Sequence, residues 1–128
     1  MGTRSLTFVY DGVEPIINMY RQYDGYPTGH GAELAEFLAP FTLVNGLGIN
    51  ETRKVANGMG CLAAQMIVNF KKSPGGFYIY PVELDQACWQ EYEYHVYEKQ
   101  VVVKNPTEVI FEGSYDEFMS FCYDKVTE

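Results

Sequence analysis

Apolar and polar residues alternate at the start of the chain, and this alternation predicts a β-hairpin. Every second residue of 5–10 is apolar, as on one face of a strand. Asp11 and Gly12 follow, a pair typical of tight hairpin turns, and residues 16–20 form a second apolar run. Residues 22–31 include three glycines and a proline, which favour a loop.

Two stretches in the middle of the chain have the spacing of amphipathic helices. Apolar residues recur three and four positions apart over 32–41. A second stripe of this kind ends near Lys71. Its start is open, because the glycines at 58 and 60 weaken a helix. Either one helix begins near Met59, or two helical pieces begin with an N-cap at Asn50 and meet at a glycine-lined contact.

The second half of the chain adds strands and one more helix. Strands are predicted at 77–82, 92–98, 101–104 and 108–112. Ser114 and Glu117 have the spacing of a capping box and predict a final helix. We therefore expect a single α+β domain over 1–128. Its mostly antiparallel sheet has about six strands, and about three helices pack on one face.

Composition narrows the classes of function. Hydrophobic residues make up 47% of the 128 residues, enough for a core, and the net charge is −8. No basic run is longer than Lys71-Lys72, so we expect no direct nucleic-acid binding. No apolar stretch approaches the length of a membrane span, so we expect no membrane partner. The eleven tyrosines suit a binding surface or plain sheet packing.

Cysteine usage indicates a reducing compartment. The chain has three cysteines, an odd number, and residues 1–7 have no hydrophobic signal core. We therefore expect no disulfide framework and a cytoplasmic location.

The densest polar segment is the loop between the hairpin and the first helix, and it is the leading candidate for a ligand site. Its arginine suits phosphate or carboxylate, its tyrosines suit stacking on a ring, and its glycines let backbone N–H groups approach anionic oxygens. The alternative is that the loop only makes turns and its tyrosines cover the core. The candidate residues are Tyr20, Arg21, Gln22, Tyr23, Asp24, Tyr26, Gly29, His30 and Gly31.

A second polar cluster precedes the middle helix and adds Arg53 and Asn57 to the candidate ligand-binding residues. Its other members are Lys54, Gly58, Gly60 and Cys61. A glycine-rich turn before a helix can hold phosphate. The cluster lacks the Gly-Lys-Ser/Thr of a P-loop, and close helix packing through glycine explains it as well.

A cysteine hydrolase is the enzymatic alternative. Cys61 near a helix start and His95 on a later strand occur in the order of a papain-like pair. Free cysteine is also among the most buried residue types, which favours packing. Metal binding is poorly supported, since the chain has two histidines far apart in sequence. The carboxylates of Asp85, Glu91 and Glu93 could hold a hard cation, but the alternation of Glu91 and Glu93 with tyrosines more often marks a solvated strand face. We therefore expect no metal or cofactor.

The segments Met1–Thr7 and Met19–Gly31 resemble a family of uncharacterised small proteins of tailed phages, prophages and bacteria. Asn57–Gln65 and the start of the strand after Gly75-Gly76 fit the same pattern. No activity is known for that family, so the resemblance implies no catalytic residue. It implies a setting, that of a small phage accessory protein in the cytoplasm of a bacterial host cell.

Three functional hypotheses follow. The first is a protein that binds, without cleaving, a small anionic nucleotide-like ligand such as an immune signalling nucleotide, and that forms a homodimer to close its pocket. The second is an acidic protein–protein inhibitor of a host or defence protein. The third is the cysteine hydrolase that uses Cys61 and His95.

Overall fold

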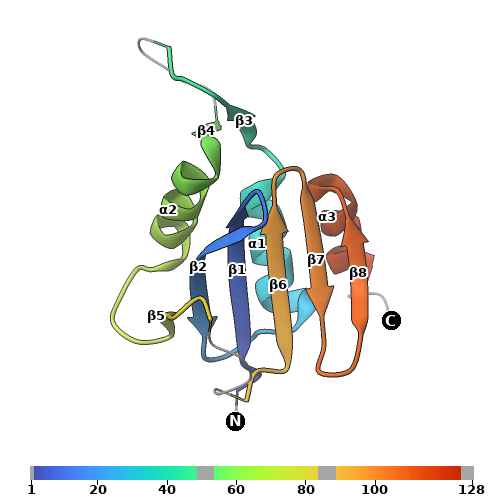
Figure 1. The fold of residues 1–128 in the computed structure, drawn as a ribbon. Coiled ribbons are helices and arrows are strands. Elements are labelled where there is room, and N and C mark those ends of the chain that lie inside the picture. Colours follow the sequence, from blue (N-terminus) through green and yellow to red (C-terminus); the bar gives the residue numbers. More distant parts are fainter. Residues whose placement is uncertain (1, 49–53, 84–88, 125–128) are drawn as a thin grey trace.

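The computed structural model describes residues 2–48, 54–83 and 89–124. Its centre is a six-stranded sheet in the order β5-β2-β1-β6-β7-β8 (Figure 1). The bounds of these strands are β1 (Ser5–Asp11), β2 (Glu14–Arg21), β5 (Phe77–Tyr80), β6 (Tyr92–Tyr97), β7 (Gln100–Lys104) and β8 (Val109–Gly113). The pair β1–β6 is parallel and the other four pairs are antiparallel, which confirms the predicted α+β fold.

Three helices lie on one side of the sheet: α1 (Ala32–Leu38), α2 (Gly58–Phe70) and α3 (Tyr115–Asp124). In Figure 1, α1 lies behind β1 and β6, α3 lies behind β7 and β8, and α2 lies beside β2. Strand alternation sends one set of side chains toward the helices, including Val9, Met19, Tyr94, Val96 and Val101. They form one core with Leu34, Leu62, Met66 and Phe118. Full burial of each large apolar side chain contributes roughly 1.5–3 kcal/mol.

The opposite face of the sheet carries a second, smaller cluster. Leu6, Phe8 and Tyr20 are buried there, with Tyr10 and Tyr80 packed against them. The rings of Tyr20 and Tyr80 stack with centroids 4.8 Å apart. Three of the chain's eleven tyrosines therefore pack in this cluster, which fits sheet packing, one of the two sequence interpretations.

A short parallel pair of strands was not predicted. β3 (Thr42–Val44) pairs with β4 (Val55–Asn57), and in Figure 1 the pair stands beyond one end of the main sheet. α2 begins at Gly58, directly after β4, so the first of the two sequence alternatives, one helix that begins near Met59, is confirmed, and a helical piece at 55–57 is excluded. A Cβ added at Gly60 would meet nothing within 4 Å, so this glycine makes no close helix contact. The predicted N-cap at Asn50 lies outside the described residues.

The starts of α3 and of the turn before α1 are each set by a few neighbouring residues. The predicted capping box of α3 is confirmed, since the Glu117 N–H donates to Ser114 Oγ (3.1 Å) and the Ser114 N–H donates to Glu117 Oε1 (2.8 Å). The predicted loop is only partly irregular, because η1 (Pro27–Gly31) forms one π-helical turn that leads directly into α1. Pro27 suits this start because it lacks an N–H that the first turn leaves unpaired.

The helices of the described segments are all too short or too polar to cross a lipid bilayer.

Candidate functional site

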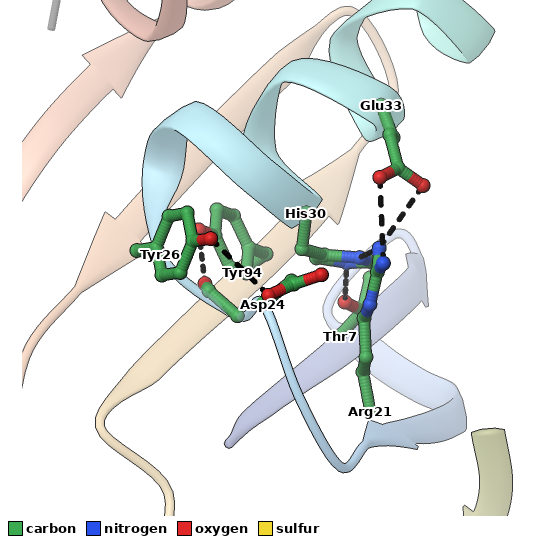
Figure 2. A network of polar contacts seen from close by, with 8 residues as sticks. Thr7, Arg21, Asp24, Tyr26, His30, Glu33 and Tyr94 are labelled. Carbon is green, nitrogen blue, oxygen red and sulfur yellow. Dashed lines mark hydrogen bonds and ion pairs between the residues drawn. The ribbon is translucent and has the colours of Figure 1, made fainter. Parts of the chain in front are cut away.

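Arg21, the last residue of β2, is the centre of the polar network that the loop builds. Its side chain lies on the helix-covered face, and the residue is only 5% exposed. The guanidinium donates two hydrogen bonds to Glu33 in the first turn of α1, from Nη1 to Oε1 (3.1 Å) and from Nη2 to Oε2 (3.3 Å) (Figure 2). The same group contacts the rings of Phe77 (4.9 Å) and Tyr23 (5.6 Å). A planar fork between aromatic rings suits arginine and not lysine.

His30 connects this arginine to the sheet. Its Nδ1 lies 3.3 Å from Arg21 Nη1, and its Nε2 lies 2.7 Å from Thr7 Oγ1 (Figure 2). Because Arg21 can only donate, Nδ1 must accept, so Nε2 carries the proton and donates to Thr7. Burial, with the nearby Arg21 charge, lowers the pKa of His30 to about 3. The ring is therefore neutral and held at both nitrogens.

The loop that carries His30 is braced by short contacts. The carbonyl of Asp24 accepts from the His30 N–H (2.7 Å), and its carboxylate accepts from Tyr26 Oη (3.1 Å). Tyr94 Oη donates to the carbonyl of Gly25 (2.7 Å) (Figure 2). A Cβ at Gly29 would lie 2.5 Å from the Asp24 carbonyl oxygen, so only glycine fits there.

The arginine opens onto a groove of about 370 Å³, which we call the helix-side groove. Its cationic residues are Arg21, Lys54 and Lys72, and its carboxylates are Glu33 and Glu36. The rest of the lining is Asn69 and the aromatic residues Phe37, Phe70 and Phe77. Arg21 Nε is buried and has no hydrogen-bond partner, although such groups are rarely left unpaired.

Some of the candidate ligand-binding residues predicted from the sequence lie in this network, and others lie elsewhere in the fold. The structure brings Arg21, Tyr23 and His30 together, and Gly29 and Gly31 fit the turn before α1. Tyr20 lies on the opposite face, stacked on Tyr80. Asp24 and Tyr26 brace the loop from its exposed side, and Gln22 is also exposed.

The second predicted cluster contributes one residue to the groove. Lys54 lines it, whereas Asn57 accepts a hydrogen bond from the Gly46 N–H (2.7 Å) within the β3–β4 unit. Arg53 lies outside the described residues. Sequence reasoning missed Thr7, Glu33 and Lys72, which come from a strand, a helix face and the segment that follows α2, none of which carries a motif.

The structure does not bring Cys61 and His95 together. Cys61 lies on α2, where its thiol donates to Gln65 Oε1 (3.4 Å). His95 points to the sheet face opposite the helices, because its neighbours Tyr94 and Val96 belong to the helix-side core. Its partners there are Tyr10 Oη at Nδ1 (2.6 Å) and Glu93 Oε1 at Nε2 (3.0 Å). The predicted nucleophile therefore has no contact with its predicted base.

Neither the other cysteines nor the carboxylates form a reactive site among the described residues. Burial raises the pKa of the Cys122 thiol to about 12, so this cysteine is protonated and unreactive. Cys88 and Asp85 lie outside the described residues. Across the ranges that the structure describes, no three His, Cys, Asp or Glu side chains gather to hold a metal ion.

No protein-family model, curated protein or solved structure shows a significant match to this chain.

Proposed function

We propose that this protein binds, without cleaving, a small ligand that carries an anionic group next to a flat ring, and that the helix-side groove holds it. Nucleotides have this chemistry. The observation that carries the proposal is Arg21, a nearly buried cation that lines a groove together with Lys54 and Lys72. A cation held in a fixed orientation loses little entropy when it pairs with a ligand anion.

The groove supplies both halves of such a ligand's chemistry. Lys54 and Lys72 add two positive charges to that of Arg21, against the carboxylates of Glu33 and Glu36. The excess of one positive charge in a strongly acidic protein favours an anion at this place. The phenylalanine side chains of the lining, Phe37, Phe70 and Phe77, offer apolar faces for the ring.

Glu33 gives the proposal a definite position for the anion. Its carboxylate accepts hydrogen bonds from both Nη atoms of Arg21. Its side chain is 51% exposed, so it can turn out to solvent. A phosphate or carboxylate of the ligand then replaces it on the same fork. Binding thus exchanges one charge-assisted pair for another.

Binding without cleavage is supported by the state of His30. Its ring is the hydrogen-bond partner of Arg21, and it is neutral, buried and hydrogen-bonded at both nitrogens. A ring held in this way positions the arginine and has no free nitrogen to move a proton on a ligand. With the family likeness, the proposal extends to a phage accessory protein that sequesters a signalling nucleotide in its bacterial host.

The experiment is native mass spectrometry of the full chain with a panel of mononucleotides and cyclic oligonucleotides, followed by calorimetric titration of any ligand retained. Lys54→Gln and Lys72→Gln are each expected to weaken binding about two- to fivefold, as one partly exposed charge does. Lys99→Gln is the matched control, since Lys99 is an exposed lysine outside the groove.

Two results would contradict the proposal. One is an unmodified mass across the whole panel. The other is a retained nucleotide whose affinity falls equally in Lys54→Gln and Lys99→Gln, because this would indicate attraction by overall charge alone. Lysine variants are chosen in place of Arg21 variants, since loss of the buried arginine also perturbs the fold.

A further inference from the structure

The other face of the sheet has a larger hollow, of about 720 Å³, which we call the sheet-side hollow. It lies between the segment that enters β6 and the turn joining β7 to β8, and its lining is Trp89–Glu93 with Lys104–Val109. Glu93 and Lys104 are register partners on the face that also carries Leu6. The hollow contains three glutamates, Glu91, Glu93 and Glu108, against one lysine.

Trp89 is the chain's only tryptophan, and it stands in this hollow with 82% of its surface exposed. Its backbone φ angle is 62°, in the left-handed region that residues other than glycine rarely adopt. Tryptophan is mostly buried in folded proteins, and it is over-represented among the residues that contribute most to binding surfaces. Its face also attracts the cationic groups of lysine and arginine.

Glu93 forms a fixed negative charge in the lining of the hollow. Its two carboxylate oxygens accept from His95 Nε2 (3.0 Å) and Gln90 Nε2 (2.9 Å). The hydrogen bond from His95 lowers the pKa of Glu93, so the carboxylate stays ionised. His95 is itself held from the other side by Tyr10 Oη (2.6 Å). An ionised carboxylate has about four acceptor positions, so it can still bind a cation.

We propose that the sheet-side hollow is a docking surface for a partner protein, and that it takes a segment presenting a lysine or arginine side chain. The basic group lies against the face of Trp89 and pairs with Glu93, while Glu91 and Glu108 at the exposed edge attract the rest of the segment. Charge complementarity carries this choice of occupant, because the hollow and the whole chain are both acidic. The surface is independent of the helix-side groove, which lies on the other side of the sheet.

The position of Trp89 provides a direct test. The full chain is titrated with a synthetic peptide of alternating glycine and arginine, and with its glycine–glutamate counterpart, while tryptophan emission is recorded. The basic peptide is expected to shift the emission of Trp89 to shorter wavelength, because the ring leaves water. Glu91→Gln and Glu108→Gln are each expected to weaken the peptide about two- to fivefold.

Glu14→Gln is the matched control, since Glu14 is an exposed glutamate on the first hairpin and outside the hollow. Equal weakening by Glu14→Gln and Glu91→Gln would overturn the proposal, because attraction by the net charge would explain both. An unchanged emission spectrum would overturn it too. So would argininamide that binds as tightly as the peptide, because this would assign the hollow to a small organic cation.

Discussion

The two hollows lie on opposite faces of one sheet and are built in opposite ways. The helix-side groove depends on Arg21, a buried cation fixed by Glu33 and His30. The sheet-side hollow depends on Trp89, an exposed ring in a lining that also contains three glutamates. The groove also gathers three of the chain's nine basic residues, although the net charge is −8. The net charge therefore predicts the acidic lining of the sheet-side hollow but not the cationic lining of the helix-side groove.

This difference has a consequence for folding. A group that is buried and hydrogen-bonded contributes to the stability of the chain as well as to any ligand, whereas an exposed group contributes to binding alone. Substitutions in the two hollows should therefore separate stability from recognition.

The largest effect is expected from removal of the buried cation. Arg21→Met leaves His30 Nδ1 without its donor and removes the guanidinium from the ring of Phe77. We expect the free energy of unfolding to fall by about 2–4 kcal/mol, whereas Trp89→Ala should change it by no more than about 0.5 kcal/mol. Urea denaturation followed by circular dichroism measures both. Equal losses in the two variants would contradict the assignment of one residue to the fold and the other to a surface.

A pH effect of the next size is expected from His30. In the folded chain its pKa is about 3, whereas in the unfolded chain it is near the ordinary value of 6.5. Between these values the unfolded state binds more protons, so stability is complete above about pH 6.5 and falls as pH falls through the window. The slope approaches about 1.4 kcal/mol per pH unit.

Urea midpoints from about pH 6.5 down to about pH 5 measure this slope, since most carboxylates stay ionised there. His30→Gln should flatten it, because an amide offers one acceptor and one donor without titrating. His95→Gln, on the other face, should leave the His30 contribution in place. If the free energy of unfolding has the same pH slope in His30→Gln, the His30 ring is not the neutral, buried group that causes it.

The fold was largely predictable because its signals are local. The capping box at Ser114 and the alternation in β1 each lie within a few residues of the chain. The pair β3–β4 was missed because three residues are too few to show a period. The parallel pairing of β1 with β6 was out of reach too, since it joins segments more than 80 residues apart and nothing in either strand specifies the partner.

The candidate site was predictable in part. Arg21 and His30 were found because they lie in a glycine-rich loop, yet the sequence could not tell that His30 is buried. Glu33 has the position of an outward residue on α1, and only the approach of β2 makes it the partner of Arg21. Trp89 was missed because the stretch before β6 shows no periodicity, and exposure is a property of tertiary structure.

A smaller effect, of opposite sign, is expected at Glu33. If its carboxylate occupies the position of the ligand's anion, Glu33→Gln weakens an internal competitor and should raise nucleotide affinity about threefold. The cost in stability should stay below about 1 kcal/mol, because the pair is partly exposed. Calorimetric titration measures the affinity, with Glu14→Gln as the control for net charge. Weaker binding in Glu33→Gln would show that Glu33 supports the ligand instead of giving way to it.

The helix-side groove and the sheet-side hollow are proposed as separate sites with opposite preferences for charge. The most direct test titrates two proteins, the double variant Lys54→Gln/Lys72→Gln and the double variant Glu91→Gln/Glu108→Gln, with both the retained nucleotide and the basic peptide. We expect the lysine variant to lose about tenfold in nucleotide affinity and to keep its affinity for the peptide, and the glutamate variant to do the reverse. Loss of both ligands in either protein would contradict it.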